Sequence, residues 1–135
     1  MAKKKIAVLF LFGLIATALI FIKNEFKGSQ TDSQFIILNW QHSPDKITTN
    51  GPVEFTISLK DKKNGPIKNA QIDVEATMNH AGMKPVMAQA KETGGGVYKV
   101  KIQLTMDGGW ILFLTIKKED GTIIKKEITF KTESR

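Results

Sequence analysis

The sequence predicts an all-β domain, an immunoglobulin-like antiparallel β-sandwich of about seven strands, preceded by one N-terminal transmembrane helix. Three observations carry this prediction. Apolar and polar residues alternate repeatedly through the last hundred positions, which is typical of half-buried strands. Glycine-containing turn signals separate these stretches, and a single long apolar run stands near the N-terminus. The chain has no cysteine, so the sandwich would lack a disulfide.

The apolar run, residues 6–22, follows three lysines. As a helix it is about 26 Å long, near the thin end of a bilayer's hydrocarbon core. A cleaved signal peptide has a shorter apolar core and then a small-residue cleavage site, whereas Ala16-Thr17-Ala18 lies inside this run. The sequence therefore favours an uncleaved anchor, with cleavage and secretion as the alternative. The lysines predict a single-pass protein of the cell membrane with its C-terminal domain outside the cytoplasm.

This pattern divides the chain into three parts. Residues 1–27 are assigned to the signal anchor, 28–33 to a polar linker and 34–135 to the extracytoplasmic β-sandwich. Within the last part, alternation predicts strands at residues 35–40, 53–60, 71–78, 86–90, 98–106, 110–116 and 122–130. We expect a hairpin turn at Asp120-Gly121. Strands with one apolar and one polar face indicate two packed sheets.

Charge argues against nucleic-acid binding. The net charge is +7, but the residues before position 31 contribute +4 of it and the remainder only +3, with alternating signs. A basic stripe interleaved with aromatic residues is missing.

An enzyme is also disfavoured. The chain has two histidines, and His42 stands in a predicted loop beside Ser43 without any sign that the hydroxyl is activated. Asp73 and Glu75 fall on the polar face of a predicted strand, where solvated carboxylates are the simpler explanation. We therefore predict no catalytic residues and no turnover.

Metal binding is the sharper hypothesis. Met78, His80, Met83 and Met87 cluster around one predicted turn, in which Gly82 lets the chain bend sharply. Thioether and imidazole are neutral, soft ligands that suit copper(I) better than zinc or magnesium. His42 contributes only if the fold brings its loop to the same end of the sandwich.

Simpler roles exist for the same residues. Met78 and Met106 each end an apolar alternation and fit the core, where methionine fills gaps. Met83 and Met87 also suit an exposed surface that binds a partner. Trp110 is expected to pack inward and Trp40 to be partly exposed.

Several spacings together resemble a known family. Pro66 precedes a strand that runs into Met78-x-His80-x-Gly82-Met83-Lys84-Pro85, and Gly96-x-Tyr98 and Met106-x-Gly108-x-Trp110 follow. Over residues 53–116 this pattern resembles the YtkA-like domain, a small exported β-sandwich similar to the soluble part of the membrane-anchored FixH family. The resemblance implies a role in copper supply and in assembly of cbb-type haem-copper oxidases. It implies His80 and Met83 as ligands, supported by Met78 and Met87.

The sequence thus supports two hypotheses. In the first, a membrane-anchored module binds or delivers copper(I) through the Met/His turn, and its envelope partner is a haem-copper oxidase or a copper chaperone. In the second, a non-catalytic interaction domain of the cell envelope presents the same turn without any metal.

Overall fold

Seven antiparallel strands make up the part of the chain that the structure, a computed structural model, describes: residues 35–80 and 82–133. The predicted anchor and linker lie outside the described residues. Among those described, no helix is long and apolar enough to span a membrane. The chain divides into two units, and all seven strands belong to the second, Thr31–Arg135.

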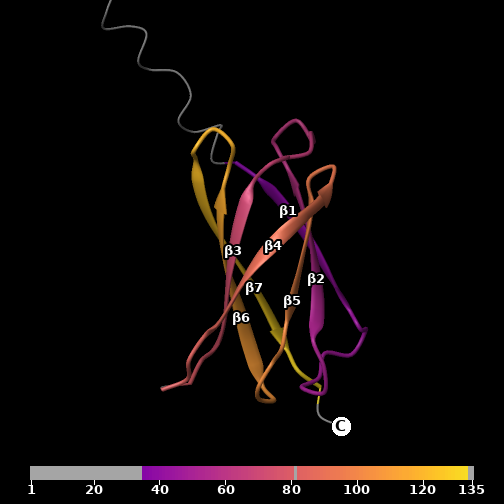
Figure 1. The fold of residues 1–135 in the computed structure, drawn as a ribbon, viewed down its shortest axis with the longest axis vertical. Helices are drawn as coiled ribbons and strands as arrows, with labels where there is room; N and C mark the ends of the chain where they lie inside the picture. The colour runs from indigo at the N-terminus through magenta and orange to yellow at the C-terminus, as the bar shows by residue number, and fades with distance from the viewer. Residues whose placement is uncertain (1–34, 81, 134–135) are drawn as a thin grey trace, which may run out of the picture. The chain divides into compact units, whose positions relative to one another are not determined.

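The strands form one curled sheet in the order β1-β2-β5-β4-β3-β6-β7 (Figure 1). Their bounds are β1 Ile37–Ser43, β2 Val53–Lys60, β3 Gln71–Met78, β4 Val86–Gly94, β5 Val97–Ile102, β6 Gly109–Lys117 and β7 Ile123–Lys131.

β4 belongs to both halves of the sheet. Its first part, Val86 to Ala90, pairs with β3, and its last part, from Lys91 to Gly94, pairs with β5. Figure 1 shows β4 running diagonally between the two halves. The sheet therefore folds back on itself, with β1, β2 and β5 on one side and β3, β6 and β7 on the other.

One core fills the space between the two halves. Alternate side chains of β2, β3 and β6 are fully or almost fully buried, as the period of a strand requires. Each such side chain contributes about 1.5–3 kcal/mol on burial. Among the residues that the structure describes, the buried apolar side chains lie between residues 36 and 128, so the unit Thr31–Arg135 is expected to fold on its own. This sandwich-like, all-β fold matches the prediction at the level of class.

The alternation located most strands within a few residues, but the bounds of β1, β4 and β5 were wrong. β4 continues to Gly94 instead of ending at residue 90. β1 starts at Ile37 rather than 35 and continues to Ser43, so His42 lies in a strand and not in a loop. β1 is an edge strand with polar residues at Asn39, Gln41, His42 and Ser43, so its sequence lacks the apolar alternation by which the other strands were predicted. β5 ends at Ile102, and the chain then leaves the sheet, which places Met106 at 51% exposed instead of in the core.

Two of the family spacings are explained at the end of the sheet opposite the Met/His turn. Leu59 N–H donates to the carbonyl of Gly96 (2.9 Å), whose φ of +77° suits glycine. A Cβ on Gly96 would lie 3.0 Å from Pro66. The Tyr98 hydroxyl donates to the Ile67 carbonyl (2.8 Å) and accepts from Ala70 N–H (3.0 Å). Pro66, Gly96 and Tyr98 therefore fix the connection before β3.

Candidate functional site

The connection between β3 and β4 carries three of the four predicted ligands. Met78 is the last residue of β3, His80 is exposed just beyond it, and Met83 is half-buried and packs against the core. Gly82 adopts a φ of +83°, in the left-handed region that favours glycine, so the chain reverses here as the sequence predicts. Soft side chains thus run from the interior to the surface along one short connection.

The methyl group of Met78 lies close to the backbone of Gly108. Met78 pairs in register with Trp110 and is 4% exposed. Gly108 adopts a φ of +138°, which favours glycine, and a Cβ built there would lie 2.7 Å from the methyl carbon at the flexible end of Met78. Trp110 Nε1–H donates to the Met106 carbonyl (3.0 Å) and fixes the same loop. The Met106-x-Gly108-x-Trp110 spacing therefore shapes the loop that lies against Met78, a proximity that the sequence alone did not reveal.

Met87, the fourth predicted ligand, lies in β4 and not in the β3–β4 connection. It is 65% exposed and pairs in register with Glu75, whereas its neighbours Val86 and Ala88 face the core. Side chains of adjacent strand residues leave the sheet on opposite faces. Met87 therefore points away from Met78, and the structure does not bring the four predicted ligands together. The alternation of β4 carries this signal, because Val86, Ala88 and Ala90 are its apolar positions.

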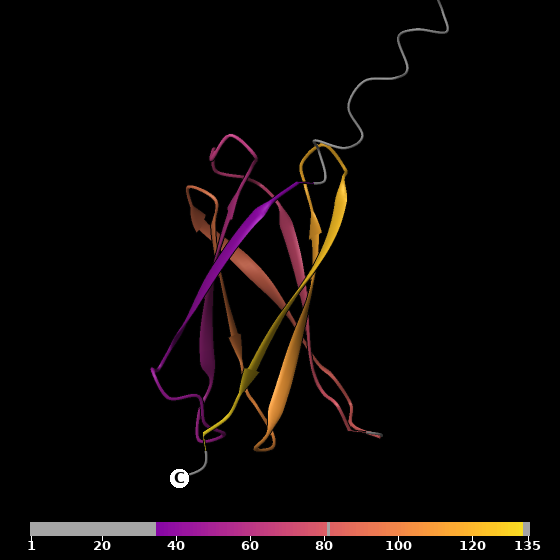
Figure 2. The same ribbon diagram turned by 180° about the vertical axis from the view of Figure 1, so that it is seen from behind.

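His42 lies at the same end of the sheet as the Met/His turn, but on the opposite side of that end. The β1–β2 and β3–β4 connections lie at one end, on opposite sides of it, in both views (Figures 1 and 2). His42 Nδ1 donates to the Pro44 carbonyl (2.9 Å), because a carbonyl can only accept. Its ring lies 6.0 Å from that of Trp40 and 6.4 Å from that of Phe55, so it belongs to an aromatic cluster.

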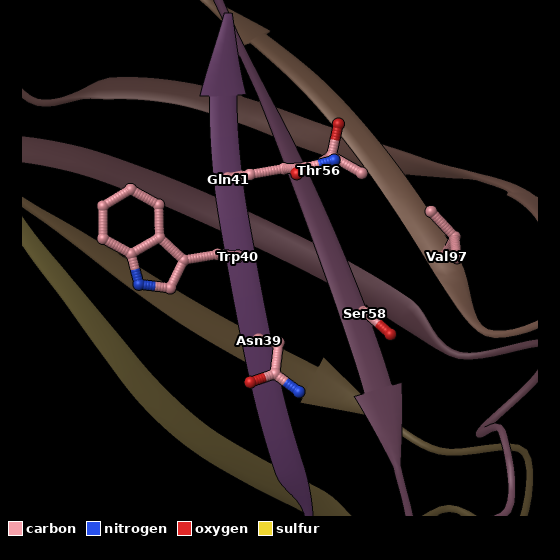
Figure 3. Close-up of a pocket in the computed structure, with 6 residues that line it drawn as sticks. All are labelled: Asn39, Trp40, Gln41, Thr56, Ser58 and Val97. Carbon is pink, nitrogen blue, oxygen red and sulfur yellow. The ribbon is translucent and has the colours of Figure 1, made fainter. Parts of the chain in front are cut away.

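The surface hollows differ in their chemistry, and one of about 430 Å³ has the charged side chains Asp61, Lys68, Lys118, Glu119 and Asp120 in its lining. One hollow of about 270 Å³ lies over β1, β2 and β5 and is lined by Asn39, Trp40, Gln41, Thr56, Ser58 and Val97, none of them ionisable near neutral pH. Figure 3 shows the Trp40 ring pointing away from Gln41, Thr56 and Val97. Among the described residues, no three histidine or carboxylate side chains gather into a group able to hold a metal ion. A metal at the β3–β4 connection would therefore depend on thioethers.

Comparison with protein-family models identifies the family of the chain. The model of the YtkA-like family matches residues 41–115, which include the Met/His turn and both glycine-aromatic spacings. The chain belongs to the YtkA-like family. Two of the spacings quoted for this YtkA-like chain, Gly96-x-Tyr98 and Met106-x-Gly108-x-Trp110, fix loops by hydrogen bonds of their aromatic side chains. No curated protein sequence matches the chain.

Two solved structures share the fold of this YtkA-like chain. A superoxide reductase (neelaredoxin) from Ignicoccus hospitalis is 12% identical, covering 79% of this chain and 89% of its own, with a TM-score of 0.54. A variant of that protein gives the same identity and TM-score, covering 76% of this chain and 85% of its own. At this identity the likeness concerns the fold alone.

Proposed function

We propose that this YtkA-like protein is a non-catalytic, membrane-anchored module with an extracytoplasmic immunoglobulin-like sandwich, and that it binds or delivers copper(I) through the β3–β4 connection. His80 and Met83 are the primary ligands, and Met78 is the third donor on the inner side. The observation that carries the proposal is that these three soft side chains lie at or beside one connection, with the Met78 methyl group next to Gly108.

The donor set fits copper(I) and not harder ions. Two thioethers and one imidazole are neutral and polarizable, which favours cuprous copper, whereas calcium and magnesium need oxygen ligands. No cluster of carboxylates competes among the described residues. An exported domain without cysteine must use such ligands, because thiolates are not available to it.

Met87 is left out of this ligand set. Its side chain lies on the outer face of β4, opposite Glu75, and Met78 lies on the inner face. The Met87→Leu variant therefore serves as the matched control for loss of a thioether near the turn.

The test is an anaerobic copper(I) titration of the unit Thr31–Arg135 against a competing chelator. We expect one-to-one binding, weakened about tenfold or more in His80→Ala and in Met83→Leu, a change of about 1.4 kcal/mol or more. Leucine keeps the volume of Met83 and so preserves packing. Met87→Leu should bind as the parent does. Affinity no greater than that of free methionine, or equal loss in Met87→Leu, would reject the proposal.

A second candidate is the metal-free interaction domain of the cell envelope. The exposure of His80, Lys84 and Met87 around the connection favours it, since exposed methionine adapts well to a partner surface. It predicts that His80→Ala keeps the fold, leaves copper affinity unchanged and loses a partner. The copper module predicts a haem-copper oxidase or a copper chaperone as partner, in line with the similarity to the FixH family.

A further inference from the structure

The outer face of β3, β4, β6 and β7 carries an apolar patch bordered by carboxylates. The register places Met87, Glu75, Phe113 and Glu127 in one row across the four strands. Phe113 is 41% exposed and Met87 65%, although both belong to regular strands. The adjacent row holds Thr77, Ile111 and Thr129. We name these seven residues the outer patch.

The two carboxylates of the outer patch lack partners among the described residues. Neither Glu75 nor Glu127 forms an ion pair or a hydrogen bond there, whereas Glu54 on the other half of the sheet pairs with Lys99 at 3.2 Å. Asp73, in the next row, already accepts hydrogen bonds from Gln71 and Gln89. Lys125, one row further along β7, makes no ion pair with Glu127. Two unneutralised charges therefore flank Phe113.

We propose that the outer patch docks a protein segment that carries an apolar side chain between two cationic ones. Although the net charge of the chain is +7, the local pair of free carboxylates around an exposed aromatic ring favours a cationic segment at this face. The same pair disfavours an anionic partner at this face. An exposed aromatic residue with methionine and isoleucine beside it is the composition of an interface centre.

The spacing of the carboxylates defines the partner further. Glu75 and Glu127 stand two strands apart, which corresponds to roughly 10 Å between their backbones. Lysine or arginine residues seven positions apart on a helix match this span, because seven residues rise about 10.5 Å. Apolar residues midway between them then fall on Phe113. This site is separate from the inner-facing Met78 and does not depend on copper.

The test uses amide chemical-shift mapping of the unit Thr31–Arg135 with a defined probe. The probe is a helical peptide of fifteen residues with two central leucines and two flanking lysines seven positions apart, and its control carries glutamates instead of the lysines. We expect shifts confined to outer positions of β3, β4, β6 and β7 with the lysine peptide and none with the control peptide. Glu75→Gln/Glu127→Gln should weaken binding roughly fivefold or more, since exposed charge pairs are individually modest.

The matched control is Glu54→Gln/Glu119→Gln, which removes two charges outside the outer patch and should leave binding unchanged. Phe113→Ser should abolish the shifts while the spectrum stays folded, because the ring is already exposed. Equal binding of both peptides, shifts centred on β1 or β2, equal loss in the control variant, or shifts that depend only on protein concentration through self-association would each overturn the proposal.

Discussion

Tyr98 both fills the core and fixes the connection before β3. Its ring is fully buried, and its hydroxyl joins the Ile67 carbonyl and the Ala70 amide on the connection before β3. Burial is the main reason why the pKa of Tyr98 is raised above 10.0; the hydrogen bond from Ala70 opposes the rise, and the charge of Glu92 adds to it.

The raised pKa predicts a dependence of stability on pH. A group whose pKa is higher in the folded state stabilises the fold fully below its unfolded pKa, here 10.0, and this contribution is lost as the pH rises through the folded pKa. Because the chain has one tyrosine, tyrosinate absorbance reports Tyr98 alone. We expect its midpoint above pH 10.0 in the folded protein and near 10.0 in denaturant. A folded midpoint at or below the unfolded one would contradict the account.

Tyr98→Phe should lower the free energy of unfolding by about 1–3 kcal/mol at neutral pH, because the Ala70 amide and the Ile67 carbonyl lose their partner. Urea denaturation measures this loss, and the difference between the two proteins should shrink as the pH rises above 10.0. A constant difference would show that the hydroxyl is not what titrates.

Gly108 is the second residue with a specific role. Its φ is +138°, and an added methyl group would meet the Met78 methyl at 2.7 Å. Gly108→Ala should therefore destabilise the fold by about 1–3 kcal/mol through backbone strain, with a further loss from displacing Met78. Gly121→Ala is the control, since its φ is +87° but nothing lies within 4 Å of its added Cβ. Thermal unfolding should rank Gly108→Ala as clearly the less stable, and equal stability would show that the contact with Met78 costs nothing.

At the scale of elements, β6 shows that one strand serves two faces. Leu114 is buried in the core, whereas the adjacent Phe113 is 41% exposed on the outer patch. Leu114→Ala should cost about 2–5 kcal/mol of stability, as core truncations do, and Phe113→Ala less than about 1 kcal/mol. Denaturant unfolding of the two variants checks this. A larger loss in Phe113→Ala would mean that the ring supports the fold and is not available to a partner.

Local alternation explains why the strands were predictable. The apolar positions of β2 and β3 alternate over a whole strand, and all of them proved buried. Leu104 kept the alternation beyond β5 and is buried, but the backbone around it has left the sheet. A pattern of buried residues therefore does not reveal where pairing stops.

Pairing between distant strands limited the prediction of the sites. Glu75, Phe113 and Glu127 are far apart in sequence, and only the register of β3, β6 and β7 aligns them. The same holds for Gly108 beneath Met78. By contrast, the outward direction of Met87 follows from alternation within β4 and was accessible from the sequence.

At the scale of the whole molecule, the prediction is that the N-terminal segment anchors the chain in the membrane. We expect the full chain, expressed with its N-terminus intact, to remain in the membrane fraction after an alkaline wash, and residues 31–135 alone to be soluble and to unfold cooperatively. Electrophoresis of the two fractions at full-length mass checks the anchor against cleavage. A shortened, soluble product from the full chain would show that the N-terminal segment is removed.

The most direct measurement of the central proposal is the methyl carbon spectrum of methionine in the unit Thr31–Arg135 with and without one equivalent of copper(I). Four methionines report separately: Met78, Met83, Met87 and Met106. The account predicts that the signals of Met83 and Met78 move, while those of Met87 on the outer face and Met106 in its exposed loop stay in place. Equal movement of all four signals, or copper binding without movement of Met83, would contradict it.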